Sequence, residues 1–189
     1  MAARTREELI RMTCGTTTRV DENVHIGGYL AAADPAYVKA QGYTHILKLF
    51  PDDSTYAGGT HRHPGVTYKV VDADDLPEYP LDQHFAECLQ FVQGAVRDGG
   101  QILVHCHAGV SRSSTIVLLH LMINTGLPLR EAYALLKAAR PVVNPNRGFR
   151  AMLEAIDRRA LRFRQEGRAP ARPNLTAAGA VPRLRPPGS

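Results

Sequence analysis

Apolar residues along the chain follow two spacings, one typical of short buried strands and one typical of helices. Short apolar segments predict strands at 24–26, 44–50, 66–71 and 101–106. Helical spacing, capping residues and one almost wholly apolar run predict helices at 35–40, 81–96, 114–123, 128–140 and 149–166. Because strands alternate with helices, we expect an α/β fold with a central, mostly parallel sheet of about five strands, flanked by helices.

Positive charge is concentrated at the C-terminal end of the chain. The 189 residues carry a net charge of +5, yet residues 1–157 hold 15 Lys and Arg against 17 Asp and Glu. Residues 158–189 hold eight Arg against one Glu. The body is therefore mildly acidic, and we expect no nucleic-acid-binding domain.

The ends of the chain and its cysteines bear on location. The first thirteen residues lack the apolar run of a secretory signal, and no apolar stretch reaches membrane-spanning length. Neither end carries a lipidation motif. The three cysteines, Cys14, Cys88 and Cys106, show no disulfide framework spacing. We expect a reduced, cytoplasmic protein without a stable membrane anchor, with the nucleus left open and a monomer as the default.

The segment VHCHAGVSRSS, residues 104–114, places polar chemistry at the end of an apolar strand. In an α/β fold, the carboxyl end of a central strand borders the crevice where ligands usually bind. Cys106 lies at that point, and small residues after it allow several backbone N–H groups to converge on an anion. The paired donors of Arg112 match two phosphoryl oxygens. The same positive field should lower the pKa of the Cys106 thiol.

This pattern predicts a thiolate nucleophile inside a phosphate-binding loop. We expect the loop to be formed by His107, Ala108, Gly109, Val110, Ser111 and Arg112. The hydroxyl of Ser113 would donate a hydrogen bond to the Cys106 sulfur when that sulfur leaves. A buried core cysteine is the simpler interpretation of a lone Cys, but the residues that follow are too polar and too rich in Gly and Ser for a core.

The segment HCHAGVSRS, residues 105–113, is similar to the His-Cys-x-x-Gly-x-x-Arg-Ser/Thr signature of cysteine-dependent protein phosphatases. Its Ala-Gly-x-Ser-Arg-Ser part, residues 108–113, resembles the dual-specificity branch of these phosphatases. Other segments also resemble small atypical dual-specificity phosphatases, so that the likeness covers roughly residues 20–155; they are 28–50, 84–92, 125–141 and 144–153.

The resemblance implies a protein tyrosine phosphatase-like fold that needs no cofactor and no metal. It implies a catalytic domain over 20–163, preceded by an N-terminal extension over 1–19. Composition predicts a disordered Arg- and Pro-rich tail over 164–189. The implied activity is hydrolysis of phosphomonoesters on tyrosine and serine/threonine of phosphorylated protein substrates, through a phosphocysteine at Cys106.

Such chemistry needs an acid near the leaving oxygen. The segment YKVVDADDLPEYP, residues 68–80, offers Asp72, Asp74 and Asp75. In small members of the family that the chain resembles, the acid stands about thirty residues before the nucleophile and often before Pro-Glu-x-Pro. Asp75 fits that pattern at 31 residues before Cys106, and Asp72 is the alternative. In extended backbone Asp74 should point the other way.

Several further residues have weaker interpretations. The resemblance implies that His105 shapes the loop and that a turn supports it, formed by Asn144, Pro145 and Asn146. His61 and His63 have no ligand partner at a suitable spacing, so we expect no metal site. Cys88 is expected in the core, and a reversible disulfide between Cys88 and Cys106 stays open. Cys14 has no assigned role.

Two alternative functions remain. The same chemistry could act on a phosphoinositide, an inositol polyphosphate or a nucleic-acid end, but such polyanions usually require extra Lys or Arg within the loop. Alternatively, the fold could bind phosphorylated partners as an inactive scaffold. Scaffolds of this kind typically lack the nucleophile, the arginine or the acid, whereas this chain has all three.

Overall fold

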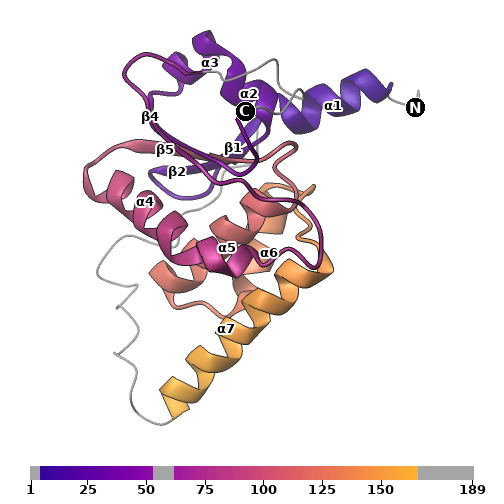
Figure 1. The fold of residues 1–189 in the computed structure, drawn as a ribbon, viewed down its shortest axis with the longest axis vertical. Helices are drawn as coiled ribbons and strands as arrows, with labels where there is room; N and C mark the ends of the chain where they lie inside the picture. The colour runs from indigo at the N-terminus through magenta and orange to yellow at the C-terminus, as the bar shows by residue number, and fades with distance from the viewer. Residues whose placement is uncertain (1–4, 53–61, 166–189) are drawn as a thin grey trace.

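The computed structural model describes residues 5–52 and 62–165 (Figure 1). Its elements, in chain order, are α1 (Arg6–Cys14), β1 (Thr17–Arg19), β2 (Val24–Gly27), α2 (Tyr29–Ala33), α3 (Pro35–Ala40), β3 (Tyr43–Lys48), β4 (Thr67–Val70), the 3₁₀ helix η2 (Leu81–His84), α4 (Phe85–Arg97), β5 (Gln101–His105), α5 (Arg112–Thr125), α6 (Leu129–Ala139) and α7 (Arg147–Gln165). The predicted strands and helices are all present.

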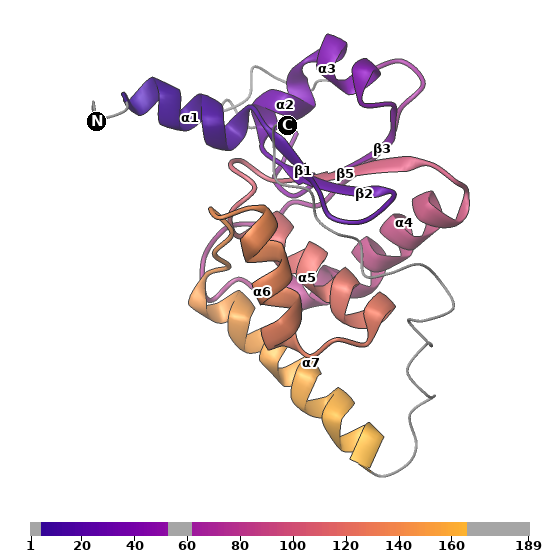
Figure 2. The ribbon, with the colours of Figure 1, turned by 180° about the vertical axis from the view of Figure 1, so that it is seen from behind.

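The five strands form one sheet in the order β1-β2-β5-β3-β4. The β2–β5, β5–β3 and β3–β4 pairs are parallel, and only β1 runs antiparallel, at one edge. Helices α2 and α3 cover one face, while α4 to α7 cover the other (Figures 1 and 2). The expected mostly parallel sheet flanked by helices is thus confirmed. Strand β5 lies at its centre, which places its carboxyl end between two neighbouring strands.

The central strand is buried on both faces because its side chains alternate between two apolar clusters. Ile102 and Val104 of β5 belong to the main core, formed with the helices α4, α5, α6 and α7. Leu103, between them, packs with Tyr43 and Ile46 in a smaller cluster on the opposite face. This double burial explains why β5 reads in the sequence as a continuous apolar run.

Helix α5 follows β5 and is buried along most of its length, from Ser113 to Met122. It runs through the middle of the helical layer, as the view from behind shows (Figure 2). Its almost wholly apolar sequence predicted this position. The helix begins at Arg112, two residues before the predicted start, so that its first turn includes the end of the polar segment.

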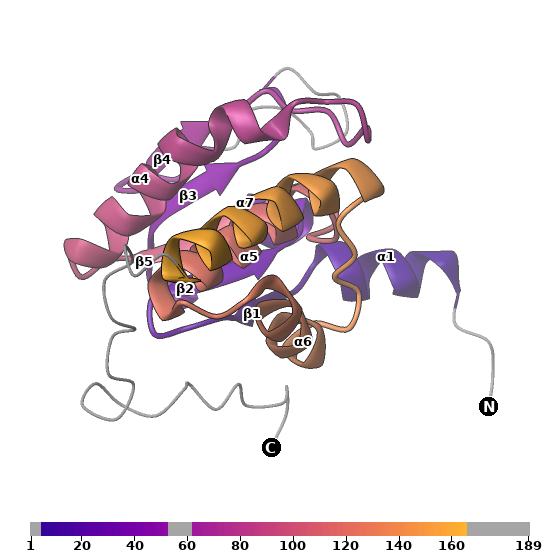
Figure 3. The ribbon, with the colours of Figure 1, turned by 90° about the horizontal axis from the view of Figure 1, so that it is seen from below.

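Three elements were not predicted. Helix α2 was missed, and α1 and β1 lie within residues 1–19, where we expected an extension. The register pairs Thr17 with Gly27 and Arg19 with His25, which makes β1 part of the sheet. Helix α1 extends away from the sheet (Figure 3) and lies beside α2 (Figures 1 and 2). The domain boundaries themselves stay a prediction.

Candidate active site

The polar segment connects the end of β5, at His105, to the start of α5, at Arg112. It borders a pocket of about 480 Å³. The lining residues come from this segment, from the residues just after β3 and from the loop after β4, and they are Phe50, Pro51, Asp74, Asp75, Cys106, His107, Ala108, Val110, Ser111 and Arg112. The structure therefore brings the predicted nucleophile, the predicted arginine and the predicted acid to one pocket.

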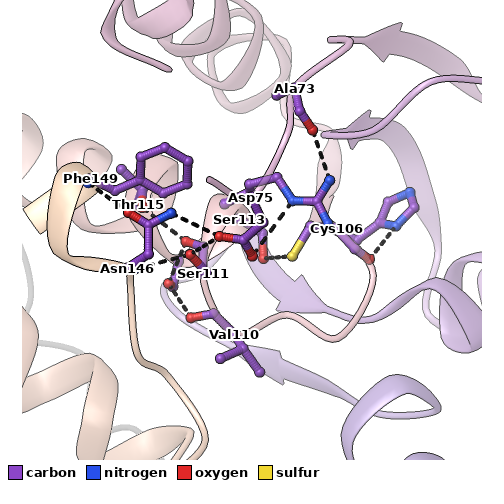
Figure 4. Close-up of polar contacts among 12 residues, drawn as sticks. Ala73, Asp75, Cys106, Val110, Ser111, Ser113, Thr115, Asn146 and Phe149 are labelled. Atoms are coloured by element: carbon purple, nitrogen blue, oxygen red, sulfur yellow. Dashed lines mark hydrogen bonds and ion pairs between the residues drawn. The ribbon is translucent and has the colours of Figure 1, made fainter. Parts of the chain in front are cut away.

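The thiol of Cys106 is buried at the base of this pocket, with 2% of the residue exposed. Burial alone would raise its pKa, but four groups outweigh that effect and lower the pKa below its usual value. They are the guanidinium of Arg112, the hydroxyl of Ser113, and the backbone N–H groups of Ser113 and Val110. The Ser113 hydroxyl lies 3.2 Å from the Cys106 sulfur (Figure 4).

The guanidinium of Arg112 has one nitrogen that is hydrogen-bonded to the backbone and another without a hydrogen-bond acceptor among the described residues. Its Nη1 donates a hydrogen bond of 2.8 Å to the carbonyl oxygen of Ala73. Its Nε is buried and has no hydrogen-bond acceptor among the described residues. The Oδ2 of Asp75 lies 3.8 Å from this Nε. The side chain, 13% exposed, lines the pocket and holds a donor whose hydrogen bond is not satisfied within the described residues.

The backbone of the loop is held by Arg140, a residue that the sequence analysis missed. This side chain is buried at 4% exposure, and its Nε and Nη2 donate to the carbonyl oxygens of Gly109 (3.1 Å) and Ala108 (2.9 Å). Nη2 also donates to the carbonyl oxygen of Thr13, at the end of α1, over 2.7 Å. Because Arg140 binds loop carbonyls, it turns them away from the pocket and leaves N–H groups to face the thiol.

Gly109 allows the tight curvature of the loop. Its φ is +67°, in the left-handed region that favours glycine. A Cβ at this position would lie 2.6 Å from the carbonyl oxygen of Gly27 and 2.8 Å from Nη2 of Arg140. Both the conformation and the close packing against β2 therefore require glycine.

Asp75 lies directly above the loop. Its Oδ1 accepts a hydrogen bond of 2.6 Å from the hydroxyl of Ser111 and one of 2.9 Å from Nδ2 of Asn146 (Figure 4). Asp72, the alternative acid, is exposed and is not among the lining residues; its backbone carbonyl accepts a hydrogen bond from the hydroxyl of Tyr79. Asp75, unlike Asp72, therefore lines the same pocket as the thiol.

The expectation for Asp74 was conditional on extended backbone. Asp74 and Asp75 both line the pocket. The expectation assumed extended backbone, in which successive side chains alternate. Strand β4 ends at Val70, and the residues from 71 to 76 adopt no regular secondary structure, so the alternation does not apply.

The two histidines of the loop are neutral at pH 7. Burial lowers the pKa of His105 to about 4, and its Nδ1 lies 3.3 Å from the carbonyl oxygen of Cys106, to which it donates. Burial and the nearby Arg112 lower the pKa of His107 as well. The ring of His107 packs against Tyr29 with 4.7 Å between centroids. Neither histidine therefore adds a positive charge to the pocket.

The turn after α6 contacts the loop at two points. The backbone N–H of Asn144 donates to the carbonyl oxygen of Val110 over 2.8 Å. The backbone N–H of Asn146 donates to the hydroxyl of Ser111 over 3.1 Å. The side chain of Asn146 reaches Asp75, a direct contact that the sequence analysis did not foresee.

The remaining predicted residues lie away from the pocket. His61 is outside the described residues, as is the tail from 166 onward, while His63 contacts the carbonyl oxygen of Ala32 through Nε2 over 2.8 Å. No cluster of metal-ligating side chains occurs among the described residues.

Cys88 is buried in the core, where burial raises its pKa to about 12. Its reversible disulfide with Cys106 stays a prediction. Burial, followed by the charge of Cys106, raises the pKa of Cys14.

A thiol of lowered pKa at the end of the central strand, in a loop of N–H donors beside an arginine, defines the architecture of the cysteine-dependent phosphatases. Comparison with known proteins places the chain more closely. The family model for the dual specificity phosphatase catalytic domain matches residues 24–159, and the chain belongs to this family.

Individual relatives agree with this family. Mouse dual specificity protein phosphatase 15 is 37% identical over 142 residues, which are 72% of this chain and 56% of that protein. The crystal structure of DUSP15 superposes with a TM-score of 0.70 at 33% identity, covering 79% of this chain and 93% of that one. The crystal structure of a mouse putative dual specificity phosphatase complexed with zinc tungstate superposes with a TM-score of 0.69 at 31% sequence identity. The match covers 82% of this chain and 92% of that one.

The chain spans about half the length of the first curated relatives that it matches. Among the helices of the described residues, none combines the length and the apolar character that a membrane span requires.

Proposed function

We propose that this chain hydrolyses phosphomonoesters on protein tyrosine and serine/threonine residues. The observation that carries the proposal is the environment of Cys106. Its thiol, with a pKa below the usual value, lies in a pocket with Arg112 and among N–H donors suited to a phosphoryl group. Family membership and the zinc tungstate complex of the mouse relative support it, because tungstate is a tetrahedral oxyanion like phosphate.

In the first step, the Cys106 thiolate attacks phosphorus, so that an S–P bond forms while the P–O bond to the substrate breaks. Arg112 and the loop N–H groups bind the equatorial oxygens, where negative charge is spread in the transition state. Asp75, in its neutral acid form, gives its proton to the leaving oxygen. General acids of this kind typically contribute about 10²- to 10⁴-fold in rate.

In the second step, water attacks the phosphocysteine. Asp75, now a carboxylate, takes a proton from this water as the new P–O bond forms. The S–P bond breaks, and the electron pair returns to the sulfur of Cys106, which the hydroxyl of Ser113 stabilises from 3.2 Å. Inorganic phosphate leaves, and Asp75 is protonated again for the next cycle.

The charges around the pocket favour a single phosphoryl group over a polyanion. Arg112 is the only cationic side chain among the described lining residues, and Asp74 and Asp75 add two carboxylates. His107 is neutral at pH 7 because burial and Arg112 lower its pKa. An inositol polyphosphate would bring further negative charge to a pocket whose described lining residues include no second cation to match it. Phosphorylated proteins are therefore the proposed substrates.

Phosphate release by the purified chain tests this function. The substrates are a phosphotyrosine peptide, a phosphothreonine peptide and an inositol polyphosphate. We expect turnover of both peptides by the wild-type chain and none by Cys106→Ser. Asp75→Asn should lose about 10²- to 10⁴-fold, while the matched Asp72→Asn variant keeps most of the activity.

Each component of the proposal can fail separately in this assay. Binding of the peptides without turnover would identify a scaffold. Faster turnover of the inositol polyphosphate than of either peptide would identify the non-protein alternative. Loss of activity in Asp72→Asn, with activity kept in Asp75→Asn, would show that the acid is assigned to the wrong residue.

A further inference from the structure

We propose that Asn146 is a positioning residue for Asp75, and that it selects Oδ2 as the oxygen that carries the transferred proton. This inference rests on the role of Asp75 in the proposed function. It concerns a residue 71 positions away in sequence, which the turn after α6 brings to the pocket.

The contacts of the Asp75 carboxylate are unequal. Oδ1 accepts two hydrogen bonds, one of 2.6 Å from the Ser111 hydroxyl and one of 2.9 Å from Nδ2 of Asn146. Oδ2 lies 3.8 Å from Nε of Arg112, which is beyond hydrogen-bond distance. One oxygen is therefore anchored by two donors, and the other is directed toward the guanidinium that would bind phosphate.

This asymmetry determines where a proton can reside. Each carboxylate oxygen has about two acceptor sites, and both sites of Oδ1 are occupied by donors. A proton on Oδ1 would meet a donated hydrogen and would force one of these bonds to break. The neutral acid therefore carries its proton on Oδ2, the oxygen that can transfer it to a leaving group beside Arg112.

The orientation of the Asn146 amide is fixed by a second contact. Its Oδ1 accepts a hydrogen bond of 3.0 Å from the backbone N–H of Phe149, in the first turn of α7. The amide nitrogen must then face Asp75. In addition, the backbone N–H of Asn146 donates to the Ser111 hydroxyl over 3.1 Å, so the hydrogen of that hydroxyl is directed to Asp75. Asn146 thus controls both donors to Oδ1.

The Asn146 side chain donates to Asp75 and accepts from the N–H of Phe149, so a substitution can remove the first contact and keep the second. Asn146→Asp keeps an acceptor for the N–H of Phe149, and a carboxylate is favourable at a helix N-terminus. It replaces the donor to Asp75 with a negatively charged oxygen. Asn146→Ser also keeps an acceptor, without adding charge. The matched control is Asn144→Asp, because Asn144 lies in the same turn with an exposed side chain and contacts Val110 only through its backbone N–H.

The assay compares two aryl phosphates with different leaving groups. Expulsion of 4-nitrophenolate depends little on an acid, whereas expulsion of phenolate from phenyl phosphate depends on it strongly. We expect Asn146→Asp and Asn146→Ser to lower kcat for phenyl phosphate by about tenfold or more, with a smaller loss for 4-nitrophenyl phosphate. Asn144→Asp should keep the wild-type ratio between the substrates. The Tm of each variant is measured alongside.

If both Asn146 variants keep the wild-type ratio of kcat between the two substrates, with equal losses or with none, the inference is overturned while the proposed function stays intact. The Asp75→Asn variant distinguishes failure of the proposed acid from failure of the positioning role. If that variant keeps the wild-type ratio, Asp75 is not the acid, and its role in the proposed function and this inference both fail. If Asp75→Asn changes the ratio and the Asn146 variants do so at an unchanged Tm, the positioning role is confirmed.

Discussion

The Nε of Arg140 donates a hydrogen bond of 3.1 Å to the carbonyl oxygen of Gly109, at the tightest point of the phosphate loop. The two residues are 31 positions apart in sequence. The same guanidinium also donates to the carbonyl oxygen of Ala108, the preceding loop residue, and to that of Thr13 at the end of α1. It therefore links the loop to α1. The curvature that directs N–H groups at the thiol therefore depends on a buried cation that does not line the pocket.

Replacement of Arg140 should damage both stability and phosphate binding. In Arg140→Ala, the carbonyl oxygens of Ala108, Gly109 and Thr13 would lose their donor, and we expect unfolding to become easier by about 2–4 kcal/mol. Arg140→Lys keeps the charge but cannot reach all three oxygens, and it should recover only part of the loss. Urea unfolding and inhibition by inorganic phosphate measure the two effects. Unchanged values in both variants would contradict this role.

Substitution of Gly109 should be worse than substitution of a glycine with the same backbone conformation elsewhere. Gly99 has a φ of +72°, and a Cβ there would have no heavy atom within 4 Å, whereas a Cβ on Gly109 would contact Gly27 and Arg140. Gly99→Ala should therefore cost about 1 kcal/mol, from conformation alone. Gly109→Ala should cost more and should also abolish most turnover. Equal losses of stability and full activity in both variants would refute the packing argument.

The chemistry of the loop was predictable from the sequence because its parts are contiguous. Cys106, Arg112 and Ser113 lie within eight residues, between a strand and a helix whose apolar patterns are clear. The three-residue strand β1 is too short to show a period, so its place in the sheet could not be foreseen. The alternation expected for Asp74 applies only to extended backbone, and the backbone from 71 to 76 is irregular.

The supporting residues were harder to find because their contacts are long-range. Arg140 ends an amphipathic helix and looks like an ordinary solvent-exposed arginine, yet it is buried by the loop and by α1. Asn146 was expected only to support the loop. Its contact with Asp75 depends on how the turn after α6 packs against the loop after β4, and periodicity carries no information about that packing.

The hydroxyl of Ser113 should act mainly in the second step. It stabilises the Cys106 sulfur as the S–P bond breaks, and a hydrogen bond to a charged group is worth about 1.5–3 kcal/mol. Ser113→Ala should therefore slow breakdown of the phosphocysteine by roughly 10- to 100-fold. Rapid-mixing experiments with 4-nitrophenyl phosphate should then show a burst of nitrophenol equal to the enzyme concentration. Absence of a burst, together with normal steady-state turnover, would exclude this role.

The fold should lose stability in mild acid through His25. Burial lowers the pKa of this residue from 6.5 to about 4, and its Nδ1 lies 2.9 Å from the hydroxyl of Tyr43. The unfolded chain binds a proton at higher pH than the native protein, so stability falls as the pH drops from about 6.5 to about 4. The loss from this residue is about 3 kcal/mol.

Thermal unfolding between pH 7 and pH 4 measures this effect. His25→Asn should show a weaker dependence of Tm on pH than the wild-type chain, while the same substitution at the partly exposed His45 should not. Equal pH dependence in the wild-type chain and in His25→Asn would show that His25 does not contribute. His105, whose pKa burial also lowers to about 4, accounts for part of the residual dependence in every variant.

The ionisation of Cys106 is the claim on which the proposed function depends most, and alkylation kinetics test it directly. At pH 6, iodoacetamide should modify Cys106 at least about tenfold faster than it modifies free glutathione, because the lowered pKa keeps a larger fraction as thiolate. Mass spectrometry should show Cys14 and Cys88 unmodified in the same interval, and phosphate should slow the reaction. A rate at Cys106 no greater than that of glutathione, without protection by phosphate, would contradict the account.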